Sequence, residues 1–254
     1  MKKSILAALA ASIALPGTAH AGETYIGLSG GVTFAGDSEN QGEFTATVPS
    51  TPDWGAIPSG TSLAWNTEFE TGYHLSGQLG YKFDSGLRAE IEAFYARSGV
   101  DTHNSLAAGG AIIDSVDVAV LTRGAPNAAN PTVGEVIADG QGYMKTMGVF
   151  ANLFYDFNTG ESFQPYFGAG IGFQGTKVNF SPSGVPVAED SDTGFAWQAM
   201  AGATFELSES VDLFTQFTYR GMFERADIPL TLLPATLGVK SDQALIAAGL
   251  RFEL

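Results

Sequence analysis

The feature that most constrains this chain is an alternation of apolar and polar side chains in stretches of about ten residues. Between positions 69 and 83, large apolar or aromatic residues such as Tyr73 and Leu79 occupy every second position, and small or polar residues such as Gln78 lie between them. A period of two is typical of a β-strand with one apolar face. The alternation recurs in eight stretches, at about 24–34, 69–83, 87–95, 146–157, 167–174, 195–207, 212–220 and 243–254.

The connections between these stretches alternate in length. Short turns are expected at 84–86, 158–162 and 208–210, and long loops at about 35–66, 98–141, 178–192 and 224–240. This layout is typical of an outer-membrane barrel with both chain ends in the periplasm and the long loops outside. The sequence therefore predicts an all-β fold, a closed antiparallel up-and-down transmembrane β-barrel of eight strands, which leaves no unpaired edge in lipid.

The longest loop leaves the strand number open. Within 98–141, the segment 109–123 carries apolar residues at alternating positions, among them Val116, Val118 and Val120. The segment predicts either a hairpin above the membrane or two further membrane strands, which would make ten. Asp114 and Asp117 favour the hairpin, because one of them would otherwise face lipid or lie in the middle of the barrel wall.

A soluble β-sandwich or lipocalin-like barrel would show the same alternation with its apolar side turned inward. Two features favour the membrane barrel. Aromatic residues such as Tyr81 and Tyr155 cluster near the ends of the apolar faces, as in interfacial girdles, and glycines such as Gly168 and Gly170 crowd the polar face, where a narrow interior needs room. No later segment offers 18 consecutive apolar residues, so no membrane-spanning helix is expected.

The N-terminus has the pattern of an export signal. Lys2 and Lys3 precede an apolar run at 5–15, and Ala19 and Ala21 form an A-x-A cleavage site. We expect residues 1–21 to be a cleaved signal peptide and 22–254 to be one barrel domain in the outer membrane of a Gram-negative cell. Cleavage removes both lysines and no acidic residue, which changes the formal net charge from −15 to −17.

Composition excludes several classes of function. Charged residues make up 15% of the chain, against about 25% in average soluble domains, and 27 acidic residues face 12 basic ones. A nucleic-acid partner is not expected, because phosphate binding needs a basic face. The absence of cysteine excludes disulfides, iron–sulfur clusters and thiol nucleophiles. No cofactor or metal site is expected, and the acidic residues at 37–43 and 189–192 indicate solvated loops.

Two segments resemble small Gram-negative outer-membrane barrels of the OmpA transmembrane-domain and opacity-type porin group. Residues 165–172 read PYFGAGIG, similar to the glycine-alternating fifth strand of that group. Gly249, Phe252 and Leu254 resemble its terminal assembly signal, which usually ends in phenylalanine. The resemblance implies a monomer that contacts outer-membrane lipids and lipopolysaccharide, the barrel assembly machinery and periplasmic chaperones. The peptidoglycan-binding domain of OmpA is not expected, because this sequence stops at the last strand.

Charged residues at inward positions form the candidate site. An eight-stranded barrel is only wide enough to be filled by side chains, so these charges must pair or hydrogen-bond. We expect a salt-bridged interior plug. The alternative is a narrow water path gated by Arg88 or Lys82 as it changes partner between Glu90 and Glu92. The expected plug residues are Glu70, Lys82, Arg88, Glu90, Glu92, Arg220 and Arg251.

His74 and Ser76 give an enzymatic alternative. Some outer-membrane lipid A deacylases use an H-x-S pair with a glutamate, and Glu70 or Glu90 could supply the acid. The pair lies on the second strand, rather than near the C-terminus as in those enzymes. An interior histidine with a small serine beside it is the simpler explanation, so no catalytic residue and no enzyme are expected.

Three functional hypotheses follow from the sequence. The first is a non-enzymatic protein that supports envelope integrity and displays surface loops, which would contact a host or surface ligand as an adhesin does. The second is a narrow diffusion channel, and the third is a lipid A-modifying enzyme built on His74 and Ser76. Surface loops are where ligand specificity would be encoded, and the sequence does not name the ligand.

Overall fold

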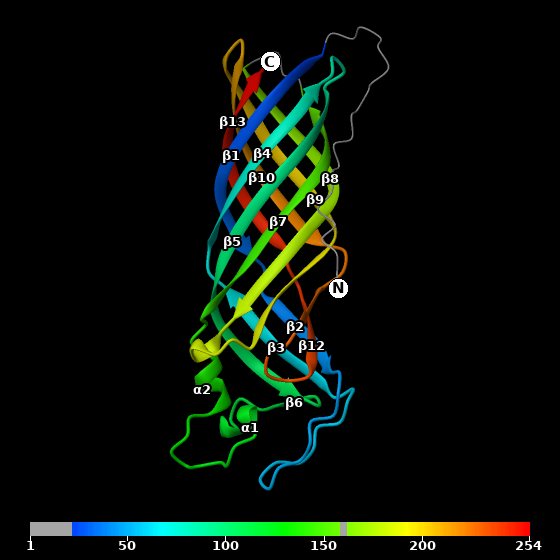
Figure 1. The fold of residues 1–254 in the computed structure, drawn as a ribbon. Coiled ribbons are helices and arrows are strands. Elements are labelled where there is room, and N and C mark those ends of the chain that lie inside the picture. Colours follow the sequence, from blue (N-terminus) through cyan, green and yellow to red (C-terminus); the bar gives the residue numbers. More distant parts are fainter. Residues whose placement is uncertain (1–21, 158–161) are drawn as a thin grey trace.

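Eight long strands form a closed antiparallel ring in the computed structural model, which describes residues 22–157 and 162–254 (Figure 1). Each strand pairs with its two neighbours around the ring, and the pairing of β5 with β7 and of β1 with β13 completes the closure. The predicted up-and-down barrel is therefore confirmed. Its strands are β1 (Glu23–Ala35), β4 (Gly72–Lys82), β5 (Leu87–Ala108), β7 (Gly142–Asp156), β8 (Phe163–Phe180), β9 (Ala188–Ser208), β10 (Val211–Met222) and β13 (Gln243–Glu253).

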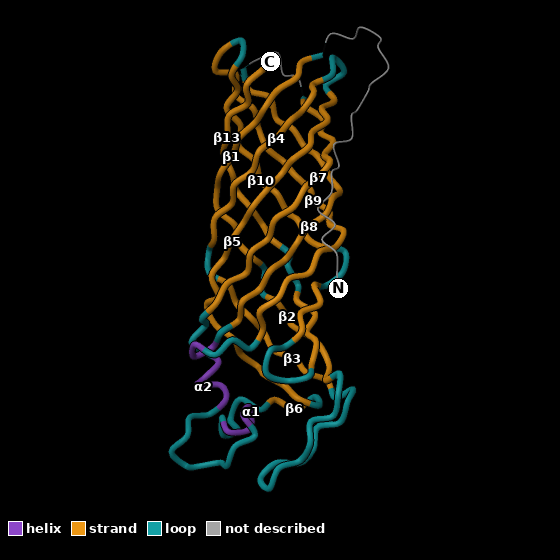
Figure 2. Tube along the Cα trace, viewed as in Figure 1, coloured by secondary structure: helices purple, strands orange, loops and turns teal. Residues whose placement is uncertain are grey.

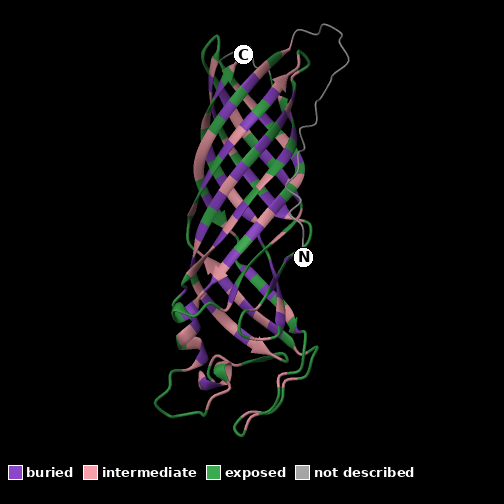
Figure 3. Cartoon of the chain, viewed as in Figure 1, coloured by how far each residue is buried: buried purple, intermediate pink, exposed green. Residues whose placement is uncertain are grey.

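The outer surface of the ring carries the apolar residues of each alternating stretch. Leu28, Ile171 and Phe195 are each more than 60% exposed, and the buried positions lie between exposed ones along every strand (Figure 3). Rings also pair on this surface, such as Phe173 with Phe195 at a centroid distance of 4.4 Å. An apolar exterior is costly in water and favourable in lipid, so the exposed bands mark the part of the barrel that spans the membrane.

Glycines on the inward face of β8 let bulky interior side chains approach the wall. A Cβ at Gly168 would collide with the ring of Phe154, and one at Gly170 would collide with the Asn152 amide on β7. The alternation of glycine with apolar residues in this strand therefore has two causes. The apolar residues face lipid, and the glycines leave room for neighbouring side chains in a narrow bore.

A second folded unit, here called the head, continues the barrel at the end opposite the C-terminus (Figures 1 and 2). It comprises 36–71, 99–141, 179–192 and 223–242. A five-stranded sheet in the order β11-β12-β2-β3-β5 forms its wall, and β5 runs through from the barrel into the head. Its further elements are β2 (Ser38–Phe44), β3 (Ser62–Phe69), β6 (Ala111–Ile112), α1 (Ala119–Thr122), α2 (Val133–Ile137), η1 (Pro182–Gly184), β11 (Ala226–Pro229) and β12 (Ala235–Val239).

The head changes the description of the four predicted loops. The segments 35–66 and 224–240 contain strands that pair with each other across the chain, as in Leu237 opposite Gly42. The segment 178–192 is mostly the ends of β8 and β9. These strands are short and pair with distant partners, so local alternation does not reveal them.

Of the two alternatives for the longest connection, the hairpin is present only as the short β5–β6 pair, and the connection adds no membrane strand among the described residues. The β5–β6 hairpin ends at Ile112. Val118 is the N-cap residue of the short helix α1, and Val120 lies within that helix. Asp114 accepts hydrogen bonds from the backbone N–H groups of Ser105 and Leu106, which ties the return of the chain to β5. Thr132 and Glu135 form a reciprocal capping box at the start of α2. In the described part of the chain, the ring has eight strands.

The head has an apolar core of its own. Phe180, Ile228, Leu237 and Val239 are fully buried, and they come from β8, β11 and β12. Burying a large aliphatic or aromatic side chain stabilises a fold by about 1.5–3 kcal/mol relative to leaving it exposed. The head is therefore a packed structure, in contrast to a set of solvated loops.

Three expectations from the sequence fall wholly or partly outside the described residues. They are the signal peptide at 1–21, its cleavage site at Ala19 and Ala21, and most of the turn at 158–162. Within the described residues, no helix has both the length and the apolar character that a membrane crossing requires.

A charge placed on the lipid-facing surface should destabilise the barrel. Ala201 is exposed on β9 between Phe167 and Phe217, so Ala201→Arg places a guanidinium in the apolar band. We expect a loss of about 2–4 kcal/mol in the free energy of unfolding, measured by urea titration in lipid vesicles, or a block of assembly.

Ser191→Arg is the matched control. Ser191 is exposed on the same face of β9, at the head end, where the neighbouring outward residues Glu189, Thr193 and Lys177 are polar. Its substitution should change the free energy of unfolding by less than about 0.5 kcal/mol. Equal effects at the two positions would contradict the assigned membrane band.

Candidate functional site

The bore of the barrel holds three arginines that are almost completely buried, and the first is Arg88. Its Nε and Nη2 atoms donate to the Asp156 carboxylate at 2.9 and 3.1 Å, and Nη1 donates to the Tyr25 hydroxyl at 3.0 Å. Tyr25 in turn donates to Glu90 at 2.6 Å. The guanidinium lies 4.0 Å from the centroid of the Phe154 ring, a cation–π distance. Residues of three different strands, β1, β5 and β7, are thus joined around one cation.

Arg220 is the centre of a second cluster nearer the head. Its Nη2 donates to Glu92 Oε1 at 3.0 Å, and its Nε and Nη2 both donate to Gln198 Oε1. The Asn152 amide donates to both Glu90 and Glu92, which connects this cluster to the one around Arg88. The Arg220 guanidinium lies 3.7 Å from the centroid of the Phe94 ring. Such a network fills the bore with side chains whose polar groups contact one another.

Arg251 and Lys82 lie nearer the turn end of the barrel. Arg251 donates to the Thr204 hydroxyl at 2.8 Å and lies 4.2 Å from the centroid of the Phe214 ring. Lys82 Nζ lies 2.8 Å from both the Asp212 and Glu253 carboxylates. Lys82 is half-buried, and its ion pairs connect β4, β10 and β13 at the mouth of the bore.

Glu70 requires a correction. It was expected on the inward face of the strand at 69–83, but β4 begins only at Gly72. Glu70 is exposed in the turn between β3 and β4, where its backbone N–H donates to the Gly99 carbonyl oxygen. The alternation continues through this turn in the sequence, although the strand does not. Glu70 therefore lies outside the interior network.

The aromatic residues of the bore are the part of the site that the sequence analysis missed. They occupy inward positions, where only polar and small residues were expected, and they stack on the arginines. The available signal was an aromatic residue out of phase with the apolar face. The main members are Phe94, Phe150, Phe154, Tyr166 and Phe214.

His74 and Ser76 lie inside the bore but do not contact each other as a catalytic pair. The Ser76 hydroxyl is hydrogen-bonded to Ser29 at 2.7 Å and to the Gln78 amide at 2.5 Å. Neither ring nitrogen of His74 has a hydrogen-bond partner among the described residues, and His74 Nε2 lies 3.9 Å from Glu92. A nucleophile needs a hydrogen-bonded base within about 3.2 Å, and this arrangement does not supply one.

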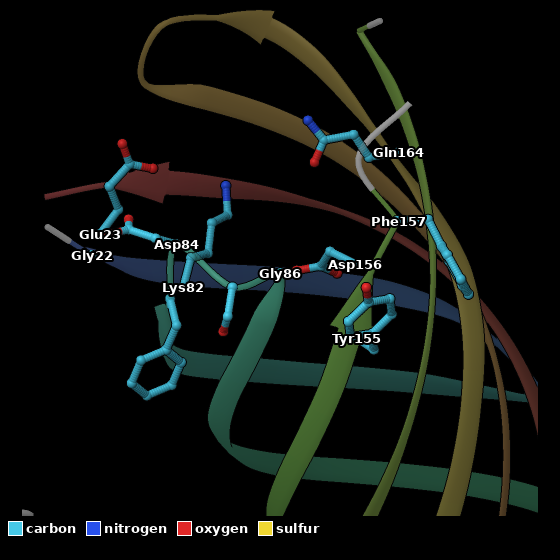
Figure 4. Close-up of a pocket in the computed structure, with 11 residues that line it drawn as sticks. Gly22, Glu23, Lys82, Asp84, Gly86, Tyr155, Asp156, Phe157 and Gln164 are labelled. Atoms are coloured by element: carbon cyan, nitrogen blue, oxygen red, sulfur yellow. The ribbon is translucent and has the colours of Figure 1, made fainter. Parts of the chain in front are cut away.

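A polar cleft of about 460 Å³ opens at the turn end of the barrel (Figure 4). Glu23 of β1, Lys82 of β4 and Asp156 of β7 contribute to its lining. Lys82 and Asp156 already form ion pairs with the interior network. In the described residues, no cluster of three or more histidine or acidic side chains has the arrangement of a metal site.

A family model for the outer membrane protein β-barrel domain matches residues 5–252. The chain belongs to this family. A location in the Gram-negative outer membrane and contact with its lipids follow from this membership. None of the curated protein sequences matches the chain.

Solved structures of outer-membrane proteins are similar to the chain in fold. OprG from Pseudomonas aeruginosa is 14% identical, with a TM-score of 0.50 over 92% of this chain and 97% of its own. Neisserial surface protein A is 15% identical, with a TM-score of 0.45 over 91% and 97%. The outer membrane protease OmpT from Escherichia coli is 8% identical, with a TM-score of 0.42 over 91% and 97%. At 14% identity, the similarity to OprG shows the fold alone.

Removing one member of a buried ion pair should destabilise the barrel. Arg220→Met keeps much of the apolar bulk and leaves the Glu92 carboxylate buried without its cation. We expect the free energy of unfolding in lipid vesicles to fall by about 3–5 kcal/mol.

The double variant Arg220→Met with Glu92→Gln is the control for this prediction. It removes both charges, so most of the lost stability should return, since no unpaired charge stays in the bore. A single variant as stable as the wild-type protein would show that the Arg220–Glu92 pair does not hold the interior together.

Proposed function

We propose that this protein is a non-conducting outer-membrane anchor that displays the head on the cell surface as a binding module. One observation carries the proposal: Arg88, Arg220 and Arg251 are at most 2% exposed in a bore that their partners fill, while a separate apolar core supports the head. A diffusion channel needs a wetted path, and charged side chains that line such a path are accessible to water. The head, by contrast, offers a surface supported by a packed core beyond the membrane band.

The contacts of the interior arginines favour a permanent plug over the gated path. Arg88 donates to Asp156 through both Nε and Nη2, and its Nη1 lies 3.3 Å from Glu90. Glu92 is held by Arg220 and Gln198. A change of partner by Arg88 from Glu90 to Glu92 would break several of these contacts at once. Each broken contact would leave a buried polar group unpaired, which is costly.

The enzymatic hypothesis receives less support. His74 and Ser76 face a filled bore, and Ser76 is already hydrogen-bonded to Ser29. A lipid substrate would approach from the membrane side of the wall, opposite to these side chains. A non-enzymatic role therefore accounts best for the position of both residues.

Planar lipid bilayers test the closed bore. The purified wild-type protein should produce no stepwise current, and neither should Glu92→Gln, in which the position expected to gate the path is neutralised. Each protein must first be shown to be folded, by its resistance to unfolding in detergent gels without heating. Stepwise currents from the folded wild-type protein, or their appearance in Glu92→Gln, would contradict the proposed plug.

Cysteine labelling in whole cells tests the display of the head. The chain has no cysteine, so a single introduced thiol reports one position. Ala128 is exposed between α1 and α2, and Ser85 is exposed in the turn at the opposite end of the barrel. A membrane-impermeant maleimide should label Ala128→Cys in intact cells, and Ser85→Cys only after the outer membrane is permeabilised. The reverse pattern would contradict the proposed display.

A further inference from the structure

The head contains an apolar cavity of about 260 Å³. Segments that are far apart in the sequence line it, among them Trp65 of β3, Leu106 of β5, Ile137 of α2 and Leu233 before β12. Protein interiors are close-packed, and few voids in them exceed the size of a water molecule. An apolar cavity of about 150 Å³ is large enough to bind benzene. The cavity in the head therefore has room for a larger apolar molecule.

His103 supplies the first polar group of the cavity wall. The side chain is 3% exposed, and its Nδ1 lies 2.9 Å from the Thr67 hydroxyl oxygen. Asn40 Nδ2 and Trp65 Nε1 both donate to the same oxygen, at 2.8 and 3.2 Å. These donors occupy the two lone pairs of the hydroxyl, so its single proton is left to donate to His103 Nδ1.

The hydrogen-bond pattern determines the tautomer of His103. Because Nδ1 accepts the proton of Thr67, the neutral ring must carry its own proton on Nε2. Burial lowers the pKa of His103 to about 4, against the smaller opposing effect of Asp139, so the ring is neutral near pH 7. His103 Nε2 has no hydrogen-bond partner among the described residues. The head thus holds a buried N–H donor with no acceptor.

Arg123 adds a second donor of the same kind. Its Nη2 donates to the backbone carbonyl oxygens of Pro49, Trp54 and Gly55, and Arg123 also lines the cavity. Its Nε is buried with no partner among the described residues. A buried donor that stays unpaired costs about 1–3 kcal/mol, and an oxygen of a bound molecule would remove that cost. Both unpaired groups are donors, so a bound molecule must bring acceptors.

We propose that this cavity binds a small neutral apolar molecule with an acceptor oxygen, such as an aromatic ketone or ester, and that His103 Nε2–H donates to that oxygen. The volume fits about two fused aromatic rings with a short substituent. It is too small for a peptide helix, which is about 10–12 Å across. A neutral molecule is favoured over an anion because the chain carries a formal charge of −15.

The inference rests on the proposed role of the head as a binding module, and the two can fail separately. Conductance tests the bore alone, whereas ligand binding tests the head alone. A conducting barrel with a saturable site at His103 would overturn only the plug. A barrel that carries no current, but whose His103 NMR signal does not change on addition of the ligand, would overturn only the present inference.

Three probes of matched shape test the proposal on the folded full chain. They are 2-acetonaphthone with a neutral acceptor, 2-ethylnaphthalene with none, and 2-naphthoate with an anionic one. Titrations are followed by the NMR signal of His103 Nε2–H, which reports this site and not the partition of the probe into detergent. The ketone should bind saturably and move the signal downfield, and its affinity should exceed that of the hydrocarbon by about three- to tenfold.

Two variants complete the experiment, with binding followed by the fluorescence of the naphthalene probes. His103→Asn retains an oxygen that can accept from Thr67 but lacks the Nε2 donor, so it should reduce ketone affinity to that of the hydrocarbon. Ala108→Trp places a large ring at the cavity wall and should abolish the binding of both, whereas the exposed Ala128→Trp should leave it unchanged. Circular dichroism and heat-modifiability check that each variant is folded.

Three outcomes would overturn the proposal. The first is equal affinity for ketone and hydrocarbon in the wild-type protein. The second is an unchanged ketone affinity in folded His103→Asn. The third is tighter binding of 2-naphthoate than of the ketone, which would assign the site to an anion held by Arg123. Because the first and third outcomes need no substitution, the test stands even if a variant fails to fold.

Discussion

Charge burial inside a narrow bore is the constraint on which the rest of this structure depends. A guanidinium transferred from water to an apolar interior is costly unless carboxylates and further hydrogen-bond partners surround it. Arg88 has Asp156, Tyr25 and Glu90 around it, and Arg220 has Glu92 and Gln198. These partners come from different strands. The same contacts that compensate the buried charge therefore also fix how the strands lie around the ring.

The aromatic rings of the bore complete that environment. Phe94 and Phe154 present their faces to Arg220 and Arg88 at 3.7 and 4.0 Å. Stacked rings occupy space that water would otherwise fill, and they attract the cation through their negative faces. Glycines on β8 make room for Phe154 at the wall. The inward face thus combines cations, carboxylates, rings and glycines in one packed interior, and this composition argues against a permanent water path.

The barrel was predictable from the sequence because its signal is local. A lipid-facing strand must place an apolar residue at every second position, so 87–95 or 195–207 can be assigned without knowledge of their partners. The sequence also indicates that Arg88, Glu92 and Arg220 face inward. It does not indicate which carboxylate each arginine contacts, because pairs such as Arg220 and Glu92 are 128 positions apart.

The head was not predictable for the same physical reason. Its own strands have two to eight residues, and β12 pairs with β2 from the other end of the chain, as in Gly238 opposite Gln41. Strands this short contain too few alternating positions to be distinguished from loops, so they appear as loops in the sequence. In the sequence, His103 is an isolated imidazole, and only the fold shows that the Thr67 hydroxyl lies at its Nδ1. Glu70 shows the opposite error, in which the sequence predicts a strand where there is none. The alternation extends into the turn before β4, which begins only at Gly72.

A double-mutant cycle between Arg88 and Asp156 tests most directly whether the interior charges hold the barrel together. Arg88→Met, Asp156→Asn and the double variant are unfolded with urea in lipid vesicles, and the coupling energy is taken from the four free energies of unfolding. The hydrogen bonds that Nε and Nη2 of Arg88 donate to Asp156 predict a favourable coupling of about 1–3 kcal/mol. A coupling near zero would contradict the account, because Arg88 and Asp156 would then contribute to stability independently.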